Sequence, residues 1–123
     1  MLCDFDQMKA EEITELYQRK VARCERLTVA RIEVKEGAIT HSHSHESEEM
    51  ILVLKGSWSF QLPSGEVIVK PDQMICIPRG VEHSSHALED TIAIDICAAP
   101  RADWASGADQ PLHSDPDQSL WAV

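Results

Sequence analysis

The chain has 123 residues, a formal net charge of −10 and 43% apolar residues. This length fits one domain with a hydrophobic core of its own. The acidic balance argues against nucleic acid as a partner, because phosphate binding needs clustered lysines and arginines, and it also disfavours anionic membrane surfaces. No apolar run is long enough to span a bilayer, and the start lacks a signal segment. We therefore expect a cytoplasmic protein without a membrane partner, whose four scattered cysteines stay reduced.

The N-terminal segment, residues 1–24, is expected to contain a short helix. Apolar residues such as Ile13, Leu16 and Tyr17 fall on one face if residues 8–20 are helical. We expect this helix to cover the end of a barrel.

From residue 26 onward, apolar residues alternate with polar ones, which is the pattern of β-strands. Many short strands with regular turn signals predict an all-β sandwich or barrel. We expect this barrel to occupy residues 25–102 and the polar tail, residues 103–123, to lie irregularly on its surface. The expected strands are 27–34, 38–45, 49–54, 57–62, 66–69, 73–77 and 91–97.

Two of these expected strands, 49–54 and 91–97, have no clearly polar face. In the second strand, three isoleucines share one face, and Asp95 lies on the other face with a threonine, an alanine and a cysteine. A sheet that is apolar on both faces must be covered on both. One face is expected to line the barrel interior and the other to meet a second sheet or a second subunit, which predicts a homodimer.

Three histidines and one glutamate form the most informative pattern of the chain. His43 and His45 are two residues apart, so their side chains leave the same face of a strand. Glu49 follows four residues later, and His83 comes after a turn at residues 78–80. Imidazoles and a carboxylate suit a divalent transition metal, so these four residues are predicted to form one metal site. The alternative interpretation is an exposed histidine-rich loop.

The same residues match two sequence motifs of the cupin superfamily, which the chain resembles. The first, G-x5-H-x-H-x3,4-E-x6-G, is met at every fixed position from Gly37 to Gly56. The second, G-x5-P-x-G-x2-H-x3-N, is met at its proline, second glycine and histidine and departs at its two ends, Asp72 and Ala87. The resemblance implies a double-stranded β-helix, or jelly-roll barrel. It also implies a metal held by the three histidines and Glu49, with Ni, Zn, Mn or Fe as candidates.

The run that starts at His83 also looks like the small KdgF cupins of pectin and alginate breakdown. In that group a strand ends in Asp-x-Phe and an arginine follows; here Asp95, Cys97 and Arg101 stand in those places, and Glu49 stands where the group often has glutamine. The resemblance implies a small sugar acid as substrate, with 4,5-unsaturated uronates opened to 4-deoxy-5-keto uronates. Asp95 would then move protons, and Arg101 would pair with the substrate carboxylate.

Both catalytic candidates also have structural interpretations. Asp95 could orient a ligand histidine, and Arg101 could pair with a neighbouring acidic residue. Two other functions fit the same ligands: an Fe-dependent dioxygenase, and a module that binds a small ligand without turnover. Metal analysis together with a uronate turnover assay separates these possibilities.

Overall fold

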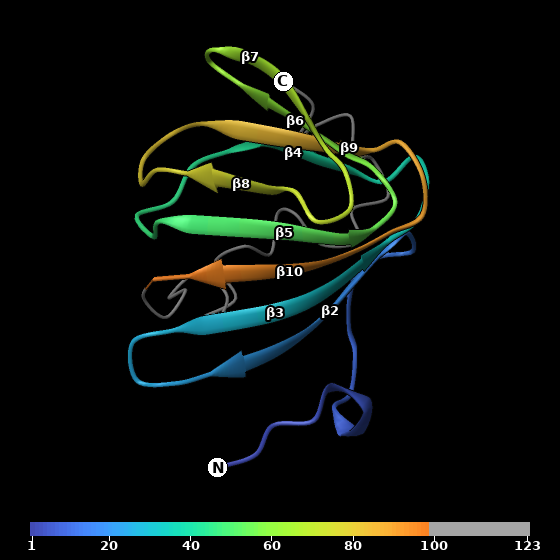
Figure 1. Cartoon of the computed structure of the whole chain (residues 1–123), viewed down its shortest axis with the longest axis vertical. Helices are drawn as coiled ribbons and strands as arrows, with labels where there is room; N and C mark the ends of the chain where they lie inside the picture. The colour runs from blue at the N-terminus through green and yellow to red at the C-terminus, as the bar shows by residue number, and fades with distance from the viewer. Residues whose placement is uncertain (99–123) are drawn as a thin grey trace.

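The structure, a computed structural model, describes residues 1–98. These residues form ten strands in two antiparallel sheets that face each other, as Figure 1 shows. The strands are β1 Glu11–Thr14, β2 Tyr17–Arg23, β3 Thr28–Val34, β4 Ile39–His43, β5 Glu49–Lys55, β6 Trp58–Leu62, β7 Gly65–Val69, β8 Met74–Ile77, β9 His83–Ala87 and β10 Thr91–Cys97. One sheet has the order β1-β2-β3-β10-β5-β8 and the other β4-β9-β6-β7. The predicted all-β jelly-roll fold is confirmed.

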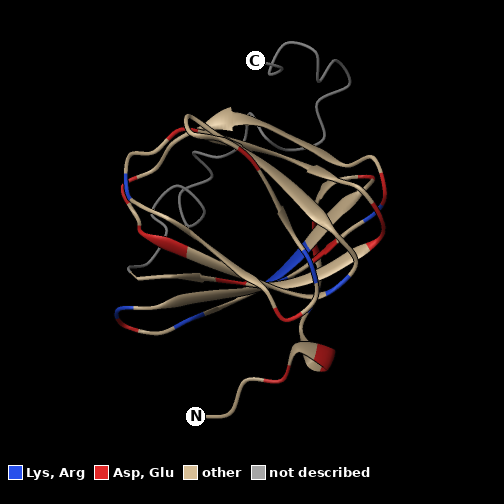
Figure 2. Cartoon of the chain, turned by 45° about the horizontal axis from the view of Figure 1, so that its top comes forward, with Lys and Arg blue, Asp and Glu red and all other residues tan. Residues whose placement is uncertain are grey.

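Figure 2 shows the two sheets as opposing walls, with many acidic and basic residues on the turns between strands.

The alternation of residue types that predicted the strands corresponds to an alternation of buried and less buried side chains. In β3, Ala30, Ile32 and Val34 are buried while Arg31 and Glu33 are not. Apolar side chains from both walls meet between the sheets, and burying each large one stabilises the fold by roughly 1.5–3 kcal/mol. The cluster comprises Ala30, Ile32, Val34, Ala38, Ile51, Val53, Trp58, Phe60, Val69, Ile75, Ile77, Ala87 and Ala93.

The predicted helix over residues 8–20 is wrong. Within this range, residues 11–14 form β1 and residues 17–20 form the first part of β2, which pairs with β3 along its whole length. Within residues 1–98, the helical structure is a single 3-10 turn, Phe5–Gln7. The helical spacing was a coincidence, because Ile13 belongs to one strand and Tyr17 to the next. The strand alternation in β2 was hidden because a charged residue, Arg19, occupies one of its inward positions.

Three further observations concern the predicted surroundings of the barrel. The outer face of the six-stranded sheet carries a row of apolar side chains, as the strands 49–54 and 91–97 had indicated. All four cysteines are free thiols. In the described part of the chain, no helix has the length and apolar character needed to cross a membrane. The outer-face side chains are Met50, Leu52, Leu54, Met74, Ile92, Ile94 and Ile96.

The two positions at which the second motif departs suit the local structure. Asp72 has a φ of 67°, a left-handed conformation that glycine usually adopts and that aspartate tolerates. Ala87 is completely buried in β9. Neither residue takes part in the histidine cluster, so the departures leave the expected ligands unchanged.

Gly56 is required by the turn between β5 and β6. Its φ is +91°, and a Cβ at this position would overlap the carbonyl oxygen of Asp90 and Oγ1 of Thr91. Gly37 has a similar φ of +89°, but a Cβ there would meet nothing within 4 Å. The two glycines therefore form a matched pair that separates backbone strain from steric overlap.

We predict that Gly56→Ala lowers the free energy of unfolding by more than about 3 kcal/mol, because it adds overlap to strain. Gly37→Ala should cost only about 1–2 kcal/mol, which is the strain alone. Chemical denaturation of both variants measures the difference. Equal losses would contradict the close packing at Gly56.

Candidate metal centre

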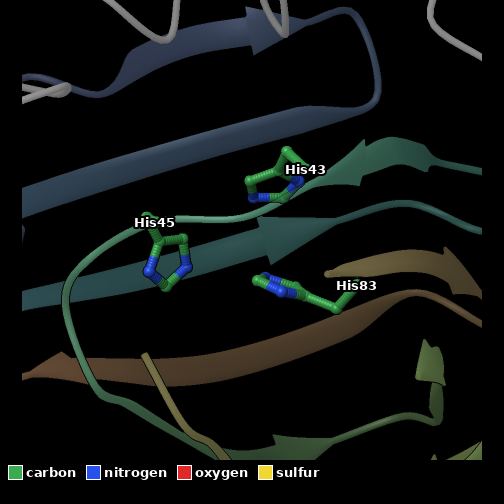
Figure 3. Close-up of side chains that lie close together, drawn as sticks. All are labelled: His43, His45 and His83. Carbon is green, nitrogen blue, oxygen red and sulfur yellow. The ribbon is translucent and has the colours of Figure 1, made fainter. Parts of the chain in front are cut away.

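The three histidines of the first and second motifs lie together at one end of the four-stranded sheet. His43 ends β4 and His83 begins β9, and the two are direct partners in the antiparallel register. His45 follows two residues after the end of β4. The ring centroids of His43 and His83 are 4.5 Å apart, those of His45 and His83 5.0 Å, and those of His43 and His45 5.8 Å. Figure 3 shows the three rings gathered around one point.

Glu49 reaches the same point from the opposite sheet. It begins β5 and is 3% exposed. Its Oε1 lies 3.2 Å from Nε2 of His45 and 3.6 Å from Nε2 of His83. The structure therefore brings together all four residues that the sequence predicted as metal ligands.

Backbone carbonyl groups determine which nitrogen of each imidazole faces the centre. Nδ1 of His43 lies 2.9 Å from the carbonyl oxygen of His41, Nδ1 of His45 lies 2.8 Å from that of Ser47, and Nδ1 of His83 lies 2.9 Å from that of Val81. A carbonyl oxygen only accepts hydrogen bonds, so Nδ1 must be the protonated nitrogen in each ring. In the neutral rings Nε2 then carries a lone pair, and the ring orientation is fixed as it is in metal-binding histidines.

The resulting arrangement of acceptors fits a cation. One ring nitrogen from each of the three histidines lies within 4.8 Å of the others. With Nδ1 protonated, Nε2 of His45 and the Glu49 carboxylate present lone pairs to each other at 3.2 Å. Two acceptors at this distance repel each other unless a proton or a metal ion lies between them. Three imidazole nitrogens and a carboxylate oxygen are a donor set that binds divalent transition metals.

Burial keeps one of these imidazoles in the form that binds metal. The pKa of His43 is lowered from 6.5 to about 4, mainly because burial disfavours the imidazolium form. The hydrogen bond to the His41 carbonyl raises this pKa, and the neighbouring His83 and His45 lower it further. His43 is therefore neutral near pH 7, as a metal ligand must be.

Asp95, predicted as a catalytic residue, lies beside this centre. It is 3% exposed on the inner face of β10, and its Oδ1 is 3.8 Å from Sγ of Cys97. Sγ of Cys97 is in turn 4.0 Å from Oε2 of Glu49. Asp95, Cys97 and Glu49 thus form a second buried group. Glu49 connects this group to the histidine cluster through its contacts with His45 and His83. Arg101, the other predicted catalytic residue, lies outside the described residues.

The two groups border one cavity of about 50 Å³ inside the barrel. Its walls combine polar groups with apolar and aromatic side chains, the usual composition of a small-molecule site. The lining residues are Ile13, Tyr17, Arg19, Thr40, His43, Glu49, Ile51, Trp58, Phe60, His83, Ser84, Ser85 and Asp95.

Arg19 is a residue of this cavity that the sequence analysis missed. It is 3% exposed and donates two hydrogen bonds to Glu11, from Nε to Oε2 at 3.0 Å and from Nη2 to Oε1 at 2.9 Å. Its signal in the sequence is its phase, because Tyr17, Arg19 and Val21 alternate in a strand. The helix expected over residues 8–20 concealed that phase.

Two facing antiparallel sheets with a histidine cluster at the end of one sheet define a jelly-roll protein with a candidate metal site. The family model for the cupin domain matches residues 30–97. The chain therefore belongs to the cupin family.

Several solved structures share the fold of this chain. KdgF from Halomonas sp. has a TM-score of 0.78 and 23% identity, over 85% of this chain and 99% of that one. An RmlC-like cupin from Shewanella frigidimarina NCIMB 400 also has a TM-score of 0.78, with 19% identity over 84% of this chain and 94% of that one. Oxalate decarboxylase from Bacillus subtilis, a protein with Mn(II) centres, has a TM-score of 0.69 and 20% identity over 79% of this chain but 29% of its own. A search of curated proteins found no match.

Proposed function

We propose that this cupin is a metal-dependent enzyme that opens 4,5-unsaturated uronates to 4-deoxy-5-keto uronates. The observation that carries the proposal is the position of Asp95, a buried carboxylate in the same cavity as His43, Glu49 and His83. Ring opening of such a sugar needs one group that moves protons beside a cationic centre that stabilises oxygen charge. The likeness to KdgF over 85% of this chain and 99% of that one supports the assignment.

We propose His43, His45, Glu49 and His83 as the residues that hold the metal, with Ni, Zn, Mn or Fe as candidates. When bound, a divalent ion supplies Lewis acidity that stabilises negative charge on a substrate oxygen. The three Nδ1 hydrogen bonds keep the imidazoles oriented and raise their basicity as ligands.

Asp95 would move the proton. In the cyclic substrate the hydroxyl at C1 gives its proton to the Asp95 carboxylate as the bond between C1 and the ring oxygen breaks. The ring oxygen is then the enol oxygen at C5, and delivery of the proton to C4 produces the C5 ketone. The proton taken at C1 is thus returned at C4, so the reaction is an isomerisation that needs no oxidant or reductant.

The remaining walls would orient the sugar ring and limit the access of water. Trp58 and Phe60 are each 2% exposed and pack with ring centroids 4.9 Å apart on the inner face of β6. Aromatic walls of this kind contact the apolar face of a sugar ring. Arg101 remains a proposed partner of the substrate carboxylate, whose two oxygens can accept hydrogen bonds from more than one arginine.

The metal proposal is tested by a pair of histidines on β9. We predict that protein purified without a nickel-affinity tag contains close to one divalent transition-metal ion per chain, and that His83→Ala loses most of it. His86→Ala is the control, because His86 lies on the same strand with an exposed side chain. Elemental analysis by mass spectrometry measures the content. Equal metal content in all three proteins would remove His83 from the site.

The proton-transfer role is tested by Asp95→Asn, which preserves the shape of the side chain. We expect the turnover of unsaturated galacturonate to fall by about 10²–10⁴-fold while metal content stays at the wild-type level. Unchanged turnover would exclude Asp95 from proton transfer. A wild-type protein inactive on every unsaturated uronate would overturn the substrate proposal and leave the metal centre untouched.

We further propose that the chain acts as a homodimer in the cytoplasm. The outer face of the six-stranded sheet supports the dimer, because Ile94 and Leu52 are direct cross-strand partners within its apolar row. Contiguous apolar surface of this kind is typical of subunit interfaces. The four free thiols are in keeping with a reducing compartment.

We predict that the wild-type protein has twice the chain mass in light scattering and that Ile94→Glu gives a monomer, because the charge cannot be buried against a second subunit. Ile68→Glu is the matched control, since Ile68 is 42% exposed on β7 of the other sheet. A monomeric wild-type protein, or a dimer that survives Ile94→Glu unchanged, would contradict the proposed interface.

A further inference from the structure

Arg19 occupies an unusual position for an arginine. Its side chain is 4% exposed on the inner face of β2, among residues that otherwise form the core. Removing a guanidinium from water is costly, so arginines are seldom fully buried without a partner or a role. Arg19 borders the cavity that contains His43, Glu49, His83 and Asp95.

Glu11 holds the guanidinium in one orientation. The two residues are direct cross-strand partners in β1 and β2, and both oxygens of the carboxylate accept hydrogen bonds, at 2.9 and 3.0 Å. This bidentate geometry fixes the plane of the guanidinium. The Glu11 side chain is 43% exposed, so the pair extends from the cavity wall to the surface.

One permanent positive charge borders the cavity. Among the described residues that line it, Arg19 carries this charge, and Glu49 and Asp95 are the carboxylates. The proposed divalent ion would balance these two carboxylates. Glu11 offsets the charge of Arg19, but its side chain is 43% exposed and outside the lining, so water screens it more than it screens Arg19. Arg19 is therefore the group of the lining to which an anionic ligand would bind.

The register of the large sheet places Arg19 beyond Asp95 as seen from Glu49. Residues paired across the strands form successive layers of inward-facing side chains. Glu49 and Cys97 are paired in the first layer, and Asp95 and Ile51 in the second. Arg19 is paired with Ile32, which lies in the third layer. Successive inward layers are about 7 Å apart along a strand. A ligand that extends from the histidine cluster past Asp95 therefore points toward Arg19.

We propose that Arg19 is a specificity-determining residue that binds the carboxylate of an acidic sugar substrate, with its guanidinium oriented by Glu11. The sugar-acid class rests on the proposed function, but selection of an acid over its neutral form does not depend on turnover. A purely structural role, in which Arg19 only attaches β1 to β2, would leave this selection unchanged.

The test compares the binding of galacturonate with that of its uncharged methyl ester, using titration calorimetry on metal-loaded protein. We expect wild-type protein to prefer the acid and Arg19→Gln to bind the acid at least about tenfold more weakly, with little change for the ester. Arg19→Lys, which keeps the charge without the fork geometry, should fall between them. Arg23→Gln is the matched control, because Arg23 is exposed on the same strand.

Three outcomes overturn the inference: no preference for the acid in wild-type protein, the same preference in Arg19→Gln, or equal weakening of acid and ester binding. If Arg19→Gln does not fold, the Nε–H resonance of Arg19 in wild-type protein decides instead. That resonance must shift with galacturonate and not with the ester.

Turnover distinguishes this inference from the proposed function. Selective acid binding that depends on Arg19, in a protein inactive on unsaturated uronates, would support the inference and overturn the proposed reaction. Turnover of unsaturated uronates with a KM that Arg19→Gln leaves unchanged would support the reaction and overturn the inference.

Discussion

The hydrogen bonds from Nδ1 of His43, His45 and His83 to backbone carbonyls are the interactions on which the candidate site depends. Each bond specifies the tautomer of its ring, and the three together direct the Nε2 lone pairs toward one point. One acceptor, His41, lies in β4, and the other two, Ser47 and Val81, lie in the loops just before β5 and β9. The ring orientations therefore depend on how these strand ends are held. Any distortion of the ends of β4 or β9 would turn the rings and separate the nitrogens, even with all three histidines present.

The interior of the barrel is both the hydrophobic core and the site. Polar residues inside a core cost stability unless their groups are satisfied. Here Arg19 is paired with Glu11, and Glu49 lies within reach of two imidazoles and a thiol. The apolar residues in the other inward positions of the two sheets provide the burial that stabilises the fold around these groups. The proposed metal chemistry and the selection of an acidic ligand would both use this low-dielectric setting, in which charges interact strongly.

A strand was predicted correctly from the sequence where the polarity of its residues matches their alternating burial, and missed where it does not. In β10, buried Ala93, Asp95 and Cys97 alternate with isoleucines, and the predicted strand 91–97 has the bounds of the observed one. In β2, the inward position is taken by Arg19, so the polarity of the residue contradicts its burial and the strand was mistaken for part of a helix. Arg19 was missed for the same reason. A charged residue inside a barrel is recognised only when its strand has already been placed.

The sequence alone determined the all-β class, most strand positions and the four residues that the structure gathers at the histidine cluster, because residue type and spacing along a strand are local properties. Tertiary structure alone decided that His83 is opposite His43, that Glu49 approaches from the other sheet, and that residues 8–20 join the barrel wall. It also decided which nitrogen of each imidazole faces inward. These features depend on strand pairing between distant segments, and a spacing in the sequence does not specify which strands will pair.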